Sequence, residues 1–213
     1  MIISHEKKFI FIHNFKVAGT SIRNALSTYG NPSFRGSSRS DKIKLLLGIY
    51  PKIYYNNFPW HENAKELKGK IPEKIFKEYY KFGFVRNPWD WQVSLYTYIL
   101  KMENHYQHKV IKSLKNFDEY IDWRVHEDLT LQKVFFYDND VCLMDYIGKI
   151  ENINHDFAKI CDRIGINNEL SHLNSSRAKD ESFLKYYSQK TLDLVNEAFS
   201  ADIKLFNYSK PTL

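Results

Sequence analysis

Residues 9–21 have the sequence FIFIHNFKVAGTS, in which a short apolar run is followed by small and polar residues. The apolar run predicts a buried strand over residues 8–13. The pattern then changes, and residues 20–26 are typical of a helix. The segment therefore predicts a strand, a turn that contains Gly19 and a helix, in that order.

This turn has the composition of a phosphate-binding loop. Backbone N–H groups at the beginning of a helix are exposed there, and the helix dipole favours an anion. Gly19 permits close approach of the backbone, Thr20 and Ser21 offer hydroxyl donors, and Lys16 adds a full positive charge. The alternative is an ordinary strand-to-helix turn with a surface lysine.

The loop differs from a Walker A loop, which places its lysine directly after the second glycine. Lys16 precedes Gly19. The Gly-Lys pairs at 69–70 and 148–149 are each followed by isoleucine, which supplies no hydroxyl for magnesium. A P-loop nucleotide kinase is therefore disfavoured, although it stays the first rival among enzymes.

A second strand-to-helix junction lies in the first half of the chain. Residues 80–85 predict a buried strand, and residues 89–102 predict a long helix. Asn87 is the expected N-cap, Pro88 suits the first helical position, and Asp90 is an acid in the first turn. Polar residues thus follow the end of a strand at both junctions.

The rest of the chain continues the alternation of strands and helices. Two amphipathic helices are expected within residues 117–137, and a third strand within residues 141–147. The core residues expected in the first of these segments are Trp123, Val134, Phe135 and Phe136. Further helices are expected at 62–68, 72–79, 154–164 and 189–199. The pattern predicts one α/β domain over residues 1–213, with a mainly parallel sheet between two layers of helices.

The charge and the cysteines restrict the classes of partner and site. A net charge of +6 favours anionic partners such as nucleotides, acidic glycans or nucleic acid. Cys142 and Cys161 form no C-x-x-C pair, so we expect two free, buried thiols rather than a disulfide or a zinc site. His105 and His108 can share a helical face but lack a third ligand, so no metal is expected.

Membrane insertion is not expected either. Residues 1–8 are short and polar, and the apolar run that follows is too short for a signal peptide or an anchor. No stretch approaches the roughly 20 apolar residues that a spanning helix requires. We expect a cytoplasmic protein.

Both junctions carry the motifs of a known family. Residues 16–21, KVAGTS, resemble the 5′-phosphosulfate-binding loop of sulfotransferases that use 3′-phosphoadenosine 5′-phosphosulfate (PAPS). Residues 82–96, FGFVRNPWDWQVSLY, resemble their 3′-phosphate-binding stretch, where an arginine at a strand's end and a serine eight positions later hold the phosphate. Arg86 and Ser94 have this spacing, and a guanidinium with a hydroxyl suits a phosphate. The resemblance implies a P-loop-like three-layer fold, with PAPS bound by Lys16, Ala18, Gly19, Thr20, Ser21, Arg86 and Ser94.

Later features resemble the carbohydrate branch of this family, which includes the uronyl 2-O-sulfotransferases. They are the segments 148–157, 173–176 and 202–208. The resemblance implies that the loop over residues 173–177 contacts the cofactor through Ser175 and Arg177, the alternative being a solvated loop. It also implies an acceptor hydroxyl on a carbohydrate or glycan.

Two positions depart from the family pattern. Trp91 stands where many relatives have a basic residue, and Lys149-Ile150-Glu151 stands where many have Arg-Phe-Glu. The first change removes a charge near the expected site. The second removes an arginine whose bidentate contact a lysine cannot reproduce.

His61 is the expected catalytic base, because it resembles the histidine that the carbohydrate branch uses. It lies at the start of a predicted helix between the two cofactor motifs, and histidine titrates near neutrality. The alternative is a histidine that only packs there, and Glu62 is the reserve candidate for the base. His13, at the end of the first strand, is expected to orient the loop.

The sequence thus predicts a metal-independent, in-line transfer of a sulfuryl group from PAPS, with His61 and Lys16 as catalytic residues. A non-catalytic protein that binds PAP or another polyanion is the second rival, and we expect no nucleic-acid partner. The acceptor could be a glycan, a lipid-linked sugar, a small metabolite or a tyrosyl peptide. Neither the acceptor nor the oligomeric state follows from the sequence.

Overall fold

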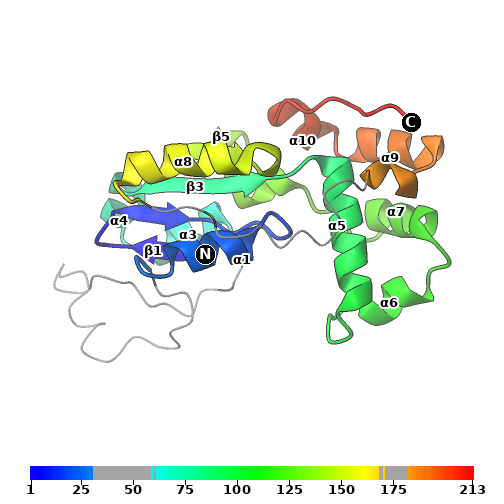
Figure 1. Cartoon of the computed structure of the whole chain (residues 1–213), viewed down its shortest axis with the longest axis horizontal. Helices are drawn as coiled ribbons and strands as arrows, with labels where there is room; N and C mark the ends of the chain where they lie inside the picture. The colour runs from blue at the N-terminus through cyan, green and yellow to red at the C-terminus, as the bar shows by residue number, and fades with distance from the viewer. Residues whose placement is uncertain (31–58, 60, 168–169, 171–181) are drawn as a thin grey trace. The chain divides into compact units, whose positions relative to one another are not determined.

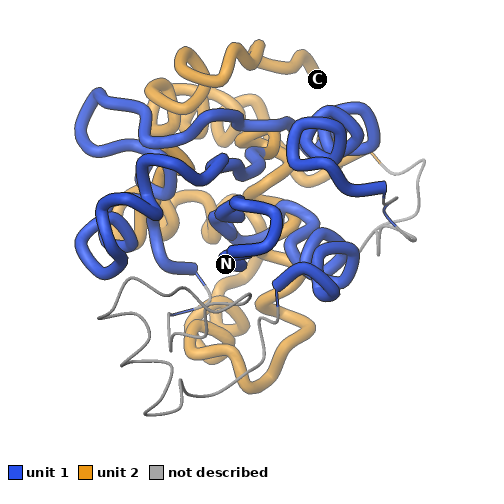
Figure 2. The backbone as a smooth tube through the Cα atoms, turned by 90° about the vertical axis from the view of Figure 1, so that its left-hand side faces the viewer, with its two compact units in different colours: residues 1–85, 134–173 blue, residues 86–133, 174–213 orange. Residues whose placement is uncertain are grey.

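The computed structural model describes residues 1–30, 59, 61–167, 170 and 182–213 (Figure 1). The chain divides into two compact units, each built from two stretches of sequence (Figure 2). Unit 1 comprises residues 1–85 and 134–173, and unit 2 comprises residues 86–133 and 174–213. That the whole chain acts as a single sulfotransferase domain stays a prediction.

Unit 1 contains a four-stranded sheet in the order β1-β2-β3-β6. Its strands are β1 (Ile2–Ser4), β2 (Phe9–Phe11), β3 (Tyr80–Val85) and β6 (Tyr146–Lys149). The pairs β2–β3 and β3–β6 are parallel, whereas β1 is antiparallel to β2. The predicted α/β fold with a mainly parallel sheet is confirmed.

Helices and a small ribbon cover this sheet. The helices of unit 1 are α1 (Gly19–Leu26), α3 (Ala64–Lys70), α4 (Glu73–Glu78) and α8 (Ile153–Ile164), with a 3-10 turn η2 (Ile150–Asn152) before α8. The ribbon pairs β4 (Tyr137–Asp138) with β5 (Val141–Cys142). Figure 1 shows α8 running alongside β3.

Different segments cover the two faces of the sheet. Successive residues of a strand point to opposite sides, so Gly83 and Gly148, which are one position apart in the register of β3 and β6, face opposite sides. A Cβ added to Gly148 would lie 3.1 Å from Cβ of Asp156 in α8, so α8 packs closely on this face. Asp156 also accepts hydrogen bonds from Tyr146 Oη (2.9 Å) and Lys149 N (2.7 Å). A Cβ added to Gly83 would instead meet the ring of Phe136, which precedes the ribbon.

Unit 2 is helical among its described residues. It contains α5 (Pro88–Lys101), α6 (His108–Ser113), α7 (Phe117–His126), α9 (Gln189–Ala198), α10 (Ser200–Leu205) and the 3-10 turn η3 (Phe183–Tyr186). A further 3-10 turn, η1 (Gln132–Phe135), begins in unit 2 and ends in unit 1. Trp91 packs edge-on against Phe199 with 6.3 Å between ring centroids, and Trp89 Nε1 donates to Leu192 O at 3.1 Å. These aromatic residues join α5 to the helices near the C-terminus.

The junction between β3 and α5 is the most accurate of the local predictions. The strand has the predicted bounds, and Pro88 is the first residue of the helix. Asn87 caps the helix by accepting hydrogen bonds from Trp89 N (3.1 Å) and Asp90 N (3.3 Å). These groups would otherwise lack partners in the first turn.

Other predictions need correction. Strand β1 was not predicted from the polar composition of residues 1–8, yet all three of its residues are buried. The expected third strand over residues 141–147 is two strands, of which only β6 belongs to the main sheet. Val134 is 44% exposed rather than part of the core, whereas Phe135 and Phe136 are buried. Cys142 is an exposed thiol, because both residues of β5 are exposed, whereas Cys161 is buried.

Within the described ranges, every helix is too short or too polar to cross a lipid bilayer.

Candidate functional site

The loop between β2 and α1 brings the first group of candidate residues together in unit 1. Lys16 and Ala18 both have left-handed backbone conformations, with φ of 61° and 57°. Such conformations are unfavourable for residues with a Cβ and are concentrated at functional sites. The loop therefore has a specific shape that ordinary connections do not require.

The beginning of α1 is suited to an anion. Ala18 is the N-cap residue, and its methyl group cannot accept a hydrogen bond from the first turn. The first turn of α1 also contains no acidic residue. The cap residue therefore supplies no side-chain acceptor, and the first turn of α1 supplies no acid, that would compete with an anion for the N–H groups at this end of the helix.

The candidate side chains differ in exposure. Thr20 is exposed, Lys16 and Ala18 are half-buried, and Ser21 is buried in α1. The hydroxyl of Thr20 and the ammonium of Lys16 can therefore meet a ligand from solution. The position of Ser21 favours a contribution from its backbone N–H over one from its hydroxyl.

Gly19 and His13 are in close contact. A Cβ added to Gly19 would lie 2.6 Å from His13 Cε1 and closer still to two other ring atoms. The ring can lie against the start of α1 only because residue 19 has no side chain. The absence of a side chain at Gly19 thus leaves room for the His13 ring, and the role of His13 in orienting the loop stays a prediction.

His61 lies beside His13. Its Nδ1–H donates to the carbonyl oxygen of His13 at 3.0 Å, and the ring centroids of the two histidines are 4.6 Å apart. Phe15 packs edge-on against the His61 ring at 5.9 Å. The structure therefore brings the predicted base to the predicted phosphate loop, although 48 residues separate His13 from His61.

The environment of His61 favours its neutral form. His61 is exposed as a residue, but its ring packs against His13 and Phe15. This partial loss of solvation lowers its pKa from the usual 6.5, and the nearby charge of Arg23 acts in the same direction. Because a carbonyl can only accept a hydrogen bond, Nδ1 carries the proton, and Nε2 has the lone pair of the neutral ring.

Glu62, the reserve candidate for the base, is in a different environment. Its side chain is fully buried and pairs with Lys70. Burial raises the pKa of Glu62, and the Lys70 ammonium opposes this shift. The carboxylate is thus engaged in the interior of unit 1, next to α3.

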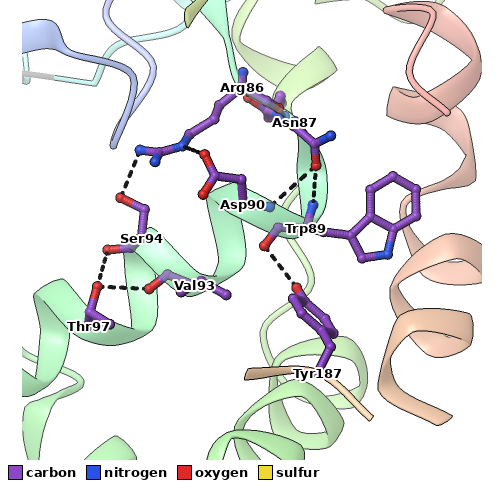
Figure 3. Close-up of polar contacts among 9 residues, drawn as sticks. Arg86, Asn87, Trp89, Asp90, Val93, Ser94, Thr97 and Tyr187 are labelled. Carbon is purple, nitrogen blue, oxygen red and sulfur yellow. Dashed lines mark hydrogen bonds and ion pairs between the residues drawn. The ribbon is translucent and has the colours of Figure 1, made fainter. Parts of the chain in front are cut away.

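Arg86 and Ser94 form the second group of candidate residues, in unit 2 (Figure 3). Arg86 Nη1 donates to Ser94 Oγ at 3.0 Å, and Arg86 Nε donates to Asp90 at 2.5 Å. The spacing of four and eight residues places Asp90 and Ser94 on the same side of α5, as Figure 3 shows. The predicted pair is therefore in contact.

Ser94 keeps a donor while it contacts the arginine. A serine hydroxyl has one proton and two lone pairs, and Ser94 uses a lone pair to accept from Arg86. Ser94 is buried, and its hydroxyl proton is the group that it can offer to a further acceptor. A guanidinium and a hydroxyl in contact can both donate to a single phosphate.

Three of the remaining predicted positions have different outcomes. Trp91, the departure from a basic residue, is fully buried in the core of unit 2. Ser175 and Arg177 lie outside the described residues. Among the residues that the structure describes, no group of three or more metal-ligating side chains lies together.

Two residues near this group were not predicted from the sequence. The side-chain amide of Gln132 bonds to the backbone of Arg86, and Asp202 bonds to the backbone of Gln132. The two partners of Gln132 are 46 and 70 residues away from it in the chain. The only signal in the sequence is that Asp202 begins the C-terminal segment that resembles the family.

The comparisons with known proteins identify the class. The model of the sulfotransferase family matches residues 1–209, so the chain belongs to the sulfotransferase family. Membership makes the chain an enzyme of sulfuryl transfer in general. The match includes both junctions described above.

Individual relatives are distant. An uncharacterized protein of Archaeoglobus fulgidus is 28% identical over 127 residues, which are 56% of this chain and 94% of that protein. The crystal structure of mouse sulfotransferase SULT7A1 complexed with PAP covers 95% of this chain and 87% of its own, with a TM-score of 0.46 and 16% identity. The crystal structure of a sulfotransferase from Alicyclobacillus acidocaldarius covers 93% of this chain and 95% of its own, with a TM-score of 0.41 and 12% identity.

Proposed function

We propose that this sulfotransferase takes a sulfuryl group from PAPS and transfers it to an acceptor hydroxyl on a carbohydrate or glycan. The observation that carries the proposal is the contact between Arg86 and Ser94, reinforced by Asp90. The pair presents a cation and a hydroxyl at one place, which is the combination that a phosphate monoester needs. PAPS differs from adenosine 5′-phosphosulfate by such a group, its 3′-phosphate.

The loop before α1 is the proposed site of the 5′-phosphosulfate. Lys16 would supply a positive charge, and the first turn of α1 would supply backbone N–H groups and the dipole. Strands β2 and β3 are parallel neighbours in unit 1, so the segments that follow them begin at the same edge of the sheet. Ligands of such sheets bind beyond the carboxyl ends of the strands, and the loop before α1 follows the carboxyl end of β2.

PAPS would supply an activated sulfuryl group whose leaving group is the nucleotide phosphate. Lys16 and the N–H groups of α1 would then stabilise negative charge on the oxygens around the transferred group. His61 would accept the proton of the acceptor hydroxyl at Nε2, because Nδ1 donates to His13. This role suits a histidine whose lowered pKa keeps it neutral at pH 7.

The geometry supports His61 over Glu62 as the base. The Glu62 carboxylate is buried and paired with Lys70, so an acceptor cannot approach it without breaking that pair. His61 is exposed and close to the phosphate loop. The carbohydrate as acceptor rests on the resemblance of the later segments to the carbohydrate branch, and the net charge of +6 suits an acidic glycan. A cytoplasmic location stays a prediction from the sequence.

Calorimetric titration with three nucleotides tests the donor site. PAP carries the 3′-phosphate, AMP is the same molecule without it, and ATP is the ligand expected of a kinase. A charge-assisted contact to the 3′-phosphate predicts that PAP binds about ten- to a hundredfold more tightly than AMP. Arg86→Ala should remove most of this ratio.

Arg163→Ala is the matched control, because it removes the same charge as Arg86→Ala at a different place. Arg163 is an exposed arginine of α8 that stacks on the ring of Tyr80, 5.7 Å from its centroid. Arg163→Ala should leave the ratio unchanged. Equal affinities of the wild-type protein for PAP and AMP would refute the proposed donor, and tighter magnesium-dependent binding of ATP would favour the kinase.

A further inference from the structure

We infer that Gln132 and Asp202 are positioning residues for Arg86, and that they determine how strongly the enzyme prefers a 3′-phosphorylated nucleotide. The inference rests on the proposed function, because it assigns to Arg86 the contact with the 3′-phosphate. Both residues belong to unit 2, as Arg86 does. Neither contributes a charge to the ligand in this proposal.

The side chain of Gln132 bonds both the N–H and the carbonyl group of Arg86. Gln132 Oε1 accepts from Arg86 N at 2.9 Å, and Gln132 Nε2 donates to Arg86 O at 2.7 Å. A side-chain amide has the same donor and acceptor as a peptide group, so it can replace a neighbouring strand. Gln132 is fully buried, which keeps water from competing for these bonds.

Arg86 needs such a partner because it is the first residue after β3. The last pair of the parallel ladder with β6 is Val85 with Lys149. Beyond this pair no strand of the described sheet adjoins the chain, and α5 begins only at Pro88. Gln132 gives the backbone of Arg86 the donor and the acceptor that a neighbouring strand gives to the residues of β3.

Asp202 positions Gln132 in turn. It lies in α10, is fully buried, and accepts from Gln132 N at 2.6 Å and from Lys133 N at 3.0 Å. These are the first two N–H groups of η1, so the carboxylate caps this turn. A buried carboxylate that bonds two backbone groups restrains the turn strongly.

These contacts form one continuous series from Asp202 in α10 to the guanidinium of Arg86, which is the proposed contact of the 3′-phosphate. Asp202 restrains the backbone of Gln132, the side chain of Gln132 restrains the backbone of Arg86, and Asp90 and Ser94 restrain its guanidinium. Arg86 is thus directed from its backbone and from its side chain at the same time. A preorganised cation binds a phosphate with less loss of conformational freedom.

The test must separate positioning from mere support of the fold. A residue that only stabilises unit 2 would change the affinity for PAP and AMP by the same factor. A residue that positions Arg86 would change the affinity for PAP alone. The readout is therefore the ratio of the AMP and PAP dissociation constants of the full chain, measured by calorimetry.

Gln132→Met has nearly the same shape and lacks both hydrogen bonds. We expect it to lower the ratio by about tenfold, since the hydrogen bonds of a displaced guanidinium are partly lost. Gln107→Met is the matched control in the same unit. Gln107 is also buried and donates to Asp128 at 2.7 Å, so its loss should lower stability without changing the ratio.

Asp202→Asn provides a second, milder variant that serves if Gln132→Met does not fold. Its amide can accept at only one atom, so we expect a smaller decrease of the ratio, about two- to fivefold. An unchanged ratio in the folded variants would overturn the inference while leaving the PAPS proposal intact. If Arg86→Ala also left the ratio unchanged, the proposed function itself would fail.

Discussion

Replacement of Gly19 by alanine tests the packing that joins the phosphate loop to the proposed base. The new Cβ would lie 2.6 Å from His13 Cε1 and closer to Nε2 and Cδ2, whereas real Cβ atoms keep at least about 3 Å from other heavy atoms. The His13 ring is buried, so it can move only by displacing its neighbours. His61 would lose its position, because its ring lies against that of His13 and its Nδ1–H donates to the same residue.

The expected size of the effect follows from overpacking in a close-packed interior. Such changes typically cost about 1–3 kcal/mol, which lowers the melting temperature of a protein of this size by about 2–4 °C per kcal/mol. We also expect weaker PAP binding, since the loop before α1 must adjust. Chemical and thermal unfolding measure the first effect, and calorimetry measures the second.

Gly69→Ala is the matched control. Gly69 lies in α3, and among the described residues a Cβ there would meet no heavy atom within 4 Å apart from its chain neighbours and the backbone of its own helix. Alanine is the better helix former, so this variant should be more stable by about 0.5–1 kcal/mol and should bind PAP normally. If Gly19→Ala were as stable as the wild type and bound PAP equally well, the proposed role of the His13 contact would be refuted.

Three further predictions concern charged and titratable groups. His61→Ala should abolish transfer to a panel of sugar acceptors and spare PAP binding, and the wild-type rate should rise with pH through a midpoint below 6.5; retained transfer would move the base to Glu62. Lys16→Ala should lower the transfer rate by about a hundredfold or more, as loss of an oxyanion donor does, so near-normal turnover would remove Lys16 from the mechanism. Burial raises the pKa of Asp202 from 3.8 to about 6. The folded chain therefore binds this proton more tightly than the unfolded chain, and the resulting stabilisation, about 3 kcal/mol at most, is complete below about pH 4 and lost as the pH rises through 6. Unfolding curves from pH 4 to 7 should show this loss, and Asp202→Asn should lack it; equal slopes for both proteins would contradict the assignment.

Local patterns predicted the junction between β3 and α5 correctly. An N-cap, a proline in the first turn and an apolar run act within a few residues, so their effect depends little on the rest of the chain. The contact between Arg86 and Ser94 follows for the same reason, because both lie within nine consecutive residues. The beginning of α1 was likewise predicted to within one residue.

Failures occurred where burial depends on distant segments. Strand β1 is short and lies near polar residues, and only its pairing with β2 makes it a strand. Val134 and Cys142 are apolar or soft side chains that stay exposed among the described residues. The hydrophobic pattern of a segment indicates which residues can be buried, but it does not indicate how much cover the fold supplies.

The sequence by itself determined the class of this protein: two strand-to-helix junctions with the residues of a sulfotransferase, each built from contacts between near neighbours. Only the tertiary structure placed His61 against His13, and Gln132 and Asp202 behind Arg86. These contacts join residues 46 to 70 positions apart. No local pattern encodes such pairs, because the chain must first close long loops and bury the groups before their hydrogen bonds outweigh those to water.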